Sequence, residues 1–344
     1  MPRGGAHFTG EELDCVLAQY ELGRILETHT LATSNRRSPK KVVVTQNGTF
    51  LLKRRARGRD DIYHVSFAHS VQTFLKERGF PVAGLVTTRD NSTVLQLEGH
   101  TYELFNFMPG SRFDGSLEAV RDAGRQMARM HQHFGDFVCG WQPLKRTYHD
   151  AFAVRSRLRT IGSEKGPHEP GKGWGTLACE LARCYAVASE RVNALGFDTW
   201  PHQIVHGDWH PGNMLFQKGK VTCVLDFDSA KMAPIVTDVG NGVLQFSIVS
   251  GRPNPAEWPD YLDQQKLRGF LAGYKSTRPL DEVLLRSLPD LMIEILIAEA
   301  VTPIAATGYF ANVSGLDFLK MILRKCRWIE DNRSALLDDV LAKG

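Results

Sequence analysis

The segment IVHGDWHPGNMLFQKGKVTCVLDFDSA, residues 204–230, restricts the fold most strongly, because its short apolar runs enclose a dense polar spacer. The runs at 213–216 and 221–227 have the length of β-strands, and the Gln-Lys-Gly-Lys stretch at 217–220 supplies a turn between them. Strands on a rigid base hold the polar side chains at their ends out toward a ligand. We therefore expect a loop followed by a hairpin that presents His, Asp and Asn side chains at its open end.

The pattern along the chain changes near residue 110. Before this point, a Thr-x-x-Glu capping box at Thr9 predicts a first helix, and an Asn-Gly turn predicts a hairpin with strands at 42–45 and 49–54. Hydrophobic spacing indicates the remaining elements of a small sheet with helical cover. These are a helix at 67–79 and strand-like runs at 83–89 and 93–107.

After the Pro- and Gly-containing connector MPGSRF at 108–113, the pattern is almost wholly helical. A chain of 344 residues with 42% hydrophobic content is long enough to bury the cores of two lobes. We predict an α+β, bilobal architecture with a small antiparallel-sheet lobe at 1–107 and a larger, mostly helical lobe at 108–344. The expected helices of the second lobe span 116–134, 146–160, 175–196, 235–249, 260–275, 281–307 and 315–341.

Composition argues against several classes of protein. The formal net charge of +4 is too small to indicate a nucleic-acid binder. The most apolar stretch, 291–301, contains Glu294 and Glu299 and falls well short of the roughly 20 residues that a membrane span needs. The chain start also lacks the apolar region of a signal peptide. The cysteines lack metal-binding spacing, so we expect reduced, buried thiols in a cytoplasmic protein with neither a nucleic acid nor a membrane as partner.

The spacing of polar residues in the opening segment indicates phosphoryl transfer. His206-x-Asp208-x-x-x-x-Asn213, followed by Asp226 after the next strand, matches a phosphoryl-transfer loop and its metal-binding Asp. The reaction requires charge neutralisation and an aligned acceptor hydroxyl rather than covalent catalysis. Asn213 and Asp226 offer oxygen ligands for Mg2+, which takes its other ligands from phosphates and water. Asp208 can accept the hydroxyl proton, and Lys53 in the predicted hairpin can contact the nucleotide phosphates.

Several residues of this segment also have other interpretations. His206 and His210 have the spacing of a metal site, as in metallophosphatases, but no further Asp and His clusters follow at suitable spacing. We therefore interpret His206 as a structural residue that hydrogen-bonds the loop backbone. Asp228 either binds a second Mg2+ or caps the following turn. Asp238 is expected to brace the catalytic loop or to cap the next helix.

Other residues carry weaker signals. The basic run at 53–59 is typical of a solvated strand end and turn. Trp209, next to Asp208, could form one wall of an acceptor pocket. Glu294 and Glu299 are costly to bury alone. Either they face a solvent-filled cleft, where they would favour a cationic acceptor, or they pair with Arg or Lys from a neighbouring helix.

Through VHGDWHPGNMLF and VLDFDSA, the sequence resembles the aminoglycoside phosphotransferase and choline kinase group, which has the protein-kinase-like fold. The resemblance implies ATP-dependent phosphorylation with Mg2+, in which Asp208 is the base and Asn213 and Asp226 bind the metal. It also implies that the adenine is held by the backbone of the connector near residues 103–107. The nucleotide-binding residues that follow from it are Lys53, Ser34, Glu103, Phe105 and Phe107.

The sequence departs from this group at two places. The loop at 31–40 lacks a glycine-rich phosphate cradle, and Ser34 and Asn35 are the expected substitutes. The first-lobe helix in the group often carries a Glu that pairs with the nucleotide lysine, whereas this helix offers His69 and Gln72, with Glu77 near its end. The residue that replaces the missing Glu stays open.

The leading functional hypothesis is a kinase that phosphorylates a hydroxyl of a small molecule, because the long helices within 145–200 and 260–341 can enclose an acceptor pocket. A protein Ser/Thr kinase of the same fold would need an open groove. An inactive nucleotide-binding scaffold is disfavoured by the intact Lys53, Asp208 and metal ligands. No motif identifies the acceptor or the oligomeric state.

Overall fold

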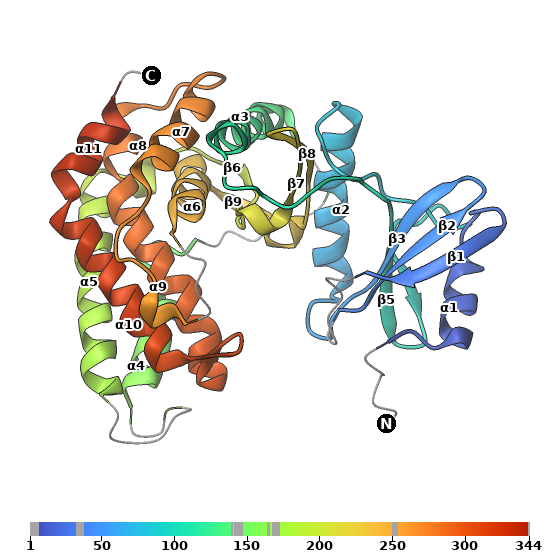
Figure 1. Ribbon diagram of the computed structural model, residues 1–344, viewed down its shortest axis with the longest axis horizontal. Helices are drawn as coiled ribbons and strands as arrows, with labels where there is room; N and C mark the ends of the chain where they lie inside the picture. The colour runs from blue at the N-terminus through green and yellow to red at the C-terminus, as the bar shows by residue number, and fades with distance from the viewer. Residues whose placement is uncertain are drawn as a thin grey trace. The chain divides into compact units, whose positions relative to one another are not determined.

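The computed structural model describes residues 7–31, 38–138, 140, 147–163, 166, 173–249 and 254–342. Contacts divide the chain into two compact units (Figure 1). Unit 1 comprises Met1–Phe113, Asp136–Pro143 and Asn213–Ala230, and unit 2 comprises Asp114–Gly135, Leu144–Gly212 and Lys231–Gly344. Unit 1 thus continues past residue 107 and includes a segment from the second half of the chain.

A five-stranded antiparallel sheet forms the centre of unit 1. Its elements along the chain are α1 (Gly10–Leu17), β1 (Ile25–Thr30), β2 (Lys40–Thr45), β3 (Gly48–Arg54), α2 (Ile62–Glu77), β4 (Leu95–Leu97) and β5 (His100–Asn106). The strand order is β1-β2-β3-β5-β4, and α1 and α2 lie on opposite sides of the sheet (Figure 1). The predicted capping box at Thr9 and the hairpin of β2 and β3 are confirmed. The predicted strand at 83–89 is wrong, because Leu85 and Thr88 form only isolated bridges.

The two faces of this sheet differ in chemistry because side chains alternate along each strand. Leu52 and Leu104 are fully buried in a cluster with Leu13 and other apolar residues of α1. Their neighbours Lys53 and Glu103 consequently point to the opposite face, toward α2. The alternation therefore separates the hydrophobic core of unit 1 from a polar cluster.

The hairpin predicted within 204–230 forms as β7 (Met214–Gln217) and β8 (Lys220–Val224). Positive φ angles at Lys218 and Gly219 close its turn. The hairpin joins unit 1, in part through a 2.7 Å hydrogen bond from the backbone N–H of Val224 to the carbonyl of Pro81. The sequence predicts this hairpin within the helical lobe, whereas its contacts group it with the sheet.

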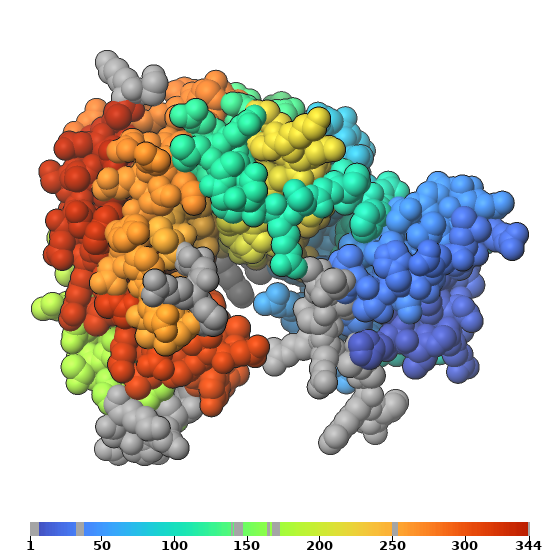
Figure 2. Space-filling model, viewed as in Figure 1, coloured from blue at the N-terminus to red at the C-terminus, as the bar shows by residue number. Residues whose placement is uncertain are grey.

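Helices make up most of unit 2. They are α3 (Leu117–His133), α4 (Phe152–Gly162), α5 (Trp174–Ala194), α6 (Ile235–Ser247), α7 (Gln264–Lys275), α8 (Glu282–Arg286), α9 (Leu288–Thr307), α10 (Gly315–Asp331) and α11 (Arg333–Leu341). The last two contribute to the surface drawn in red in Figure 2. The predicted helix 281–307 is interrupted at Ser287, because Pro289 occupies the first turn of a new helix. The predicted helix 315–341 is interrupted at Asn332.

Short elements complete the chain. They are the ribbon of β6 (His202–Val205) with β9 (Lys231–Pro234), the ribbon of β10 (Tyr309–Phe310) with β11 (Val313–Ser314), and the 3-10 turns η1 (Phe134–Asp136), η2 (Phe197–Thr199), η3 (Pro211–Asn213), η4 (Phe227–Ser229) and η5 (Pro255–Glu257). No local sequence pattern predicts the strand pairing within these ribbons. Among the described residues, no helix combines the length and apolar character needed to cross a bilayer.

Close packing of α3 against α7 positions residues that contribute to the candidate site. A Cβ atom at Gly124 would lie 2.1 Å from the carbonyl oxygen of Phe270, so only glycine permits this approach. Further along the same helices, Nδ1 of His131 lies 2.8 Å from the hydroxyl of Tyr274. The helix crossing thereby sets the position of His131.

Two predictions about buried side chains need correction. Among the described cysteines, all of which are free, Cys15 and Cys179 are exposed, so the expectation that the thiols are all buried is wrong. Trp209 is fully buried and packs edge-on against His206, so its side chain is not a wall of an open pocket.

Candidate active site

The predicted metal ligands Asn213 and Asp226 lie at the same end of the hairpin in unit 1. Met214 pairs with Val224 in the strand register, and the backbone N–H of Leu225 donates to the carbonyl of Asn213 at 2.9 Å. Asp226 follows directly, in a left-handed backbone conformation with φ of 62°. The hairpin therefore brings an amide and a carboxylate together from separate positions in the sequence.

This donor set suits Mg2+. The described residues contain no group of three or more His, Cys, Asp and Glu side chains that could hold a metal ion alone. Mg2+ is usually bound through one or two carboxylates, with substrate phosphates and water as its other ligands. An Asn and an Asp at the end of a hairpin fit that pattern better than the closed site of a structural zinc ion.

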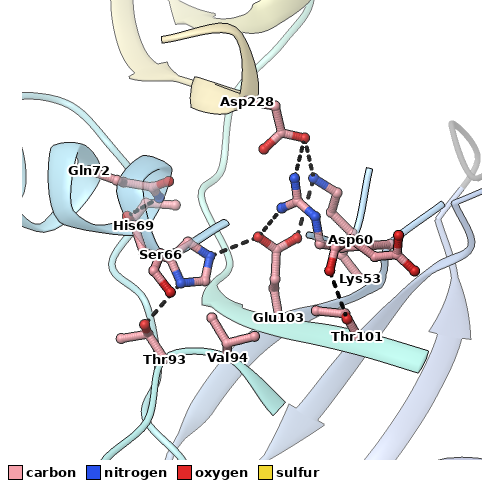
Figure 3. Close-up of polar contacts among 12 residues, drawn as sticks. Lys53, Asp60, Ser66, His69, Gln72, Thr93, Val94, Thr101, Glu103 and Asp228 are labelled. Carbon is pink, nitrogen blue, oxygen red and sulfur yellow. Dashed lines mark hydrogen bonds and ion pairs between the residues drawn. The ribbon is translucent and has the colours of Figure 1, made fainter. Parts of the chain in front are cut away.

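Lys53 is held by carboxylates on the polar face of the sheet (Figure 3). Its Nζ lies 3.3 Å from Oε2 of Glu103 and 3.6 Å from Oδ2 of Asp228. Burial alone would lower the pKa of Lys53, but Glu103 and Asp228 outweigh it and raise that pKa. Burial also opposes ionisation of Glu103, yet Lys53, His69 and Arg55 lower its pKa to about 2. Both groups are therefore charged near neutral pH.

The basic run that contains Lys53 is not a solvated strand end throughout. Arg54 and Arg55 are buried, whereas Arg57 and Arg59 are exposed. Arg54 pairs with Glu12 of α1 at 2.6 Å. Arg55 pairs with Glu103, and its Nη2 lies 2.7 Å from Oδ2 of Asp228. The prediction of a solvated run is thus wrong at the positions nearest Lys53, where carboxylates compensate the burial of charge.

The other predicted nucleotide contacts lie mostly on β5. Glu103 is in the middle of this strand, and its carboxylate is buried. Phe105 is half-buried on the same strand, and Phe107 follows it with an exposed ring and a backbone N–H that donates to Thr49 at 2.9 Å. Ser34 and Asn35 lie outside the described residues. The nucleotide contacts of all these residues stay predictions.

The predicted base Asp208 lies on a loop of unit 2 that Asp238 braces. The Asp238 carboxylate accepts hydrogen bonds from the backbone N–H groups of His206 at 2.8 Å and Gly207 at 2.7 Å. Nδ1 of His206 in turn accepts a hydrogen bond from the backbone N–H of Asp208 at 3.3 Å. The structural role expected for His206 and the bracing role expected for Asp238 are confirmed.

A buried hydrogen-bonded chain supports Asp238 from behind. Nε2 of His131 lies 3.2 Å from Oδ2 of Asp238, and Nδ1 of His131 faces the hydroxyl of Tyr274. Burial lowers the pKa of His131, which favours the neutral imidazole. Burial would raise the pKa of Asp238, but its hydrogen bonds outweigh this effect and lower it. We infer that neutral His131 donates to ionised Asp238 and accepts from Tyr274.

The acidic residues of α9 have different environments. Glu294 is fully buried and pairs with His149, rather than with Arg or Lys, at 2.8 Å. The Glu299 side chain keeps part of its surface exposed, while its carboxylate lies among protein atoms and accepts hydrogen bonds from Asn241 at 2.8 Å and Gln245 at 2.6 Å. Desolvation by the surrounding protein and the charge of Asp208 raise the pKa of Glu299 to about 7. The negative charge of the predicted base therefore acts on the Glu299 carboxylate of α9.

Glu299 also lines a cavity of about 250 Å³ within unit 2. The cavity lies among α6, α9 and α10, and most of its walls are apolar or aromatic. Its lining residues include Trp258, Phe318, Leu296, Met321, Gln245 and Lys325. Sequence reasoning identified Glu299 but not this cavity, because its walls come from segments far apart in the sequence.

Comparison with known proteins identifies the family. Residues 28–280 match the model of the phosphotransferase enzyme family. The chain belongs to this family. The predicted protein-kinase-like fold and the predicted activity of an ATP-dependent phosphotransferase acting on a small molecule are confirmed.

Named proteins and solved structures align along most of the chain. The homoserine kinase of Xanthobacter autotrophicus is 24% identical over 292 residues, covering 81% of this chain and 80% of that protein. The homoserine kinase of Hyphomonas neptunium is 25% identical, covering 82% of each. A microcompartment-associated aminopropanol kinase has a TM-score of 0.71 at 16% identity, covering 96% of this chain and 98% of that one. Amicoumacin kinase, in complex with AMP-PNP and Ca2+, has a TM-score of 0.69 at 16% identity, covering 94% of each chain.

Proposed function

We propose that this phosphotransferase transfers the γ-phosphoryl group of ATP to the hydroxyl of a small amino alcohol, with Asp208 as the base. The observation that carries the assignment is the loop of Asp208, which Asp238 holds through backbone hydrogen bonds at one end. Along the chain, this loop leads directly to Asn213 and the hairpin that brings Asn213 near Asp226. The same short segment thus carries the base and both proposed metal ligands.

In the proposed reaction, the acceptor oxygen forms a bond to the γ-phosphorus while the bond from that phosphorus to the β–γ bridging oxygen breaks, and ADP leaves. The proton of the acceptor hydroxyl passes to the Asp208 carboxylate. Asp208 is suited to this step because it is partly exposed and its backbone is fixed. Lys53 contacts the phosphates, and Asn213 and Asp226 would hold Mg2+, which would supply charge neutralisation.

Lys231 is a further cation in unit 2, which also contains Asp208. It lies where the charges of Asp238, Asp208 and Glu299 act on it, although burial dominates and lowers the pKa of its amine. A cation at this position offsets repulsion among the three carboxylates. Sequence reasoning did not single out Lys231, since a lysine five residues after Asp226 carries no distinctive pattern.

The cavity in unit 2 supports an acceptor that is small and cationic. The charge of Asp208 acts on the cavity's carboxylate, Glu299, so an amine bound at Glu299 would lie within the electrostatic field of the base. Trp258 and Phe318 place aromatic rings in the wall of the same cavity, and aromatic rings can attract a cation. A volume of about 250 Å³ suits a small amino alcohol better than a multi-ring aminoglycoside. The names of the matched homoserine and aminopropanol kinases agree with this class.

A panel of acceptors tests the proposal. ADP release would be measured with Mg2+ and homoserine, aminopropanol, ethanolamine, choline, an aminoglycoside and a generic protein substrate. We expect turnover with one of the small amino alcohols. Asp208→Asn should reduce kcat by about 1,000-fold and leave the affinity for a non-hydrolysable ATP analogue nearly unchanged.

The matched control is Asp198→Asn, an exposed aspartate of unit 2, which should behave as wild type. Turnover retained in Asp208→Asn would refute the base assignment. Phosphorylation of the aminoglycoside or the protein alone would refute the acceptor class. We also propose a cytoplasmic location, where ATP is available and the free thiols of the described cysteines stay reduced.

A further inference from the structure

The position of a carboxylate next to Lys53 differs from the arrangement in protein kinases. In those enzymes, a Glu on the first-lobe helix pairs with the β3 lysine, and movement of that helix controls the pair. Here the buried side of α2 presents His69 and Gln72, and the only acidic residue of this helix, Glu77, is exposed at its end. The partner of Lys53 therefore comes from another element.

That element is the adjacent strand β5. Lys53 and Glu103 are direct partners in the antiparallel register of β3 and β5. Side chains of such partners leave the same face of the sheet with their Cβ atoms about 5 Å apart. The ion pair is thus fixed by the strand register itself. Helix α2 contributes to the ion pair only indirectly. Its His69 contacts Glu103 rather than Lys53, with Nε2 2.7 Å from the Glu103 carboxylate (Figure 3).

Arg55 extends this arrangement to the metal-binding loop. Its guanidinium contacts Glu103 on one side and lies 2.7 Å from Asp228 on the other. Asp228 follows Asp226 by two residues, and its carbonyl oxygen is 2.6 Å from Nε2 of His64 on α2. The loop that carries Asp226 is therefore tied both to the sheet and to the helix.

We propose that Glu103 is the residue that positions Lys53 for the nucleotide phosphates, and that Arg55 couples Glu103 to the Asp226 loop. The inference rests on the proposed function. In this arrangement, the carboxylate of Glu103 on strand β5 aligns both Lys53 and the proposed metal ligand Asp226. The nucleotide site consequently needs no inward movement of a helix to assemble, in contrast to the helix-controlled site of protein kinases.

The same sheet supplies a matched control. Glu12 forms a comparable ion pair with Arg54, one residue from Lys53 on β3, but on the opposite face. Glu103→Gln and Glu12→Gln each remove one carboxylate charge from a partner arginine. Only the first should disturb Lys53, so a comparison of the two variants separates positioning from general damage to the sheet.

Three measurements would be made on the full chain: kcat with KM for ATP and for the acceptor, affinity for a non-hydrolysable ATP analogue, and hydrogen–deuterium exchange of residues 225–230 without nucleotide. We expect Glu103→Gln to lower kcat by about 100-fold, with little change in the KM for the acceptor. It should also weaken analogue binding and speed exchange in the loop. Glu12→Gln should lower the melting temperature yet keep all three values near wild type.

Equal effects of both variants, or a wild-type kcat in Glu103→Gln, would overturn the proposal. If Glu103→Gln fails to fold, Arg55→Lys is the alternative variant. It keeps the positive charge at this position, but its shorter side chain weakens the contact with Asp228. Faster loop exchange and weaker analogue binding in that variant would support the proposal, and wild-type values would overturn it. Absence of turnover in the wild-type protein would count against the proposed function instead, while the binding and exchange measurements would still decide the role of Glu103.

Discussion

Asp238 and His206 are joined by a 2.8 Å hydrogen bond from the backbone N–H of His206 to Oδ2 of a fully buried carboxylate. The second oxygen of Asp238 accepts the N–H of Gly207 at 2.7 Å. Both oxygens of one side chain thus hold the start of the loop that carries Asp208. Asp238 does not need to touch substrate to be required for activity.

The first prediction concerns this brace. In Asp238→Asn, an amide NH2 replaces one acceptor oxygen and faces a backbone donor, so one hydrogen bond is lost. We expect kcat to fall by about 100-fold through misplacement of Asp208, and the free energy of unfolding to fall by about 1–3 kcal/mol. Steady-state kinetics and urea unfolding measure the two effects.

Asp122→Asn is a suitable control, because Asp122 is also buried in unit 2 but pairs with Arg125 on α3. Its kcat should stay near that of wild type even if its stability falls. A normal kcat in Asp238→Asn would show that the loop keeps its geometry without the brace.

Local sequence was sufficient to predict the structure of the segment that carries the proposed base and metal ligands. His206, Asp208, Asn213 and Asp226 lie within one loop and hairpin, where spacing along the chain determines spacing in the structure. The turn residues and apolar runs of this segment were visible directly. The brace by Asp238 could be anticipated because it lies soon after the same segment.

The remaining features depend on contacts that are distant in sequence. The pairing of Lys53 with Glu103 follows from the register of β3 and β5, which no local pattern of either strand reveals. The burial of Arg55 is possible only because Glu103 and Asp228 neutralise it, so the basic run alone suggested solvation. The cavity at Glu299 likewise arises from helix packing.

The second prediction concerns the pH dependence of acceptor binding. Desolvation and the charge of Asp208 raise the pKa of Glu299 to about 7, so its carboxylate is ionised above that pH and neutral below it. A cationic acceptor should therefore bind more tightly as the pH rises from about 6 to about 8. A competitive amine that lacks the hydroxyl isolates binding from proton transfer to Asp208.

The inhibition constant of that amine should lose this pH dependence in Glu299→Gln, and the affinity at the higher pH should drop by about 10-fold. Glu257→Gln, which changes a carboxylate outside the cavity lining, serves as the control. A pH profile that survives in Glu299→Gln would assign the ionisation to another group.

The third prediction concerns the metal. Chelation of Mg2+ by EDTA should abolish turnover, and added Mg2+ should restore it. Asp226→Asn removes one of the two proposed protein ligands, so it should raise the Mg2+ concentration needed for half-maximal activity by about 10-fold or more. Mg2+-dependent binding of an ATP analogue should shift in parallel.

Asp90→Asn, in an exposed turn of unit 1, provides the matched control. An unchanged Mg2+ requirement in Asp226→Asn would remove Asp226 from the metal site. Restoration of activity by Zn2+ rather than Mg2+ would contradict the choice of metal.

The fourth prediction concerns stability in unit 2. Burial lowers the pKa of His149, but its hydrogen bonds with Glu294 and Asn193 outweigh burial and raise that pKa above the usual value of 6.5. The stabilisation from protonated His149 is therefore complete below pH 6.5 and is lost as the pH rises through the pKa of the folded state.

Glu294→Gln should flatten this dependence and lower the free energy of unfolding by about 3 kcal/mol at low pH. Glu180→Gln, which breaks the exposed pair with Arg327, should cost less than about 1 kcal/mol and keep the wild-type slope. Urea unfolding across this pH range tests the pair, and an unchanged slope in Glu294→Gln would exclude His149 as the titrating group.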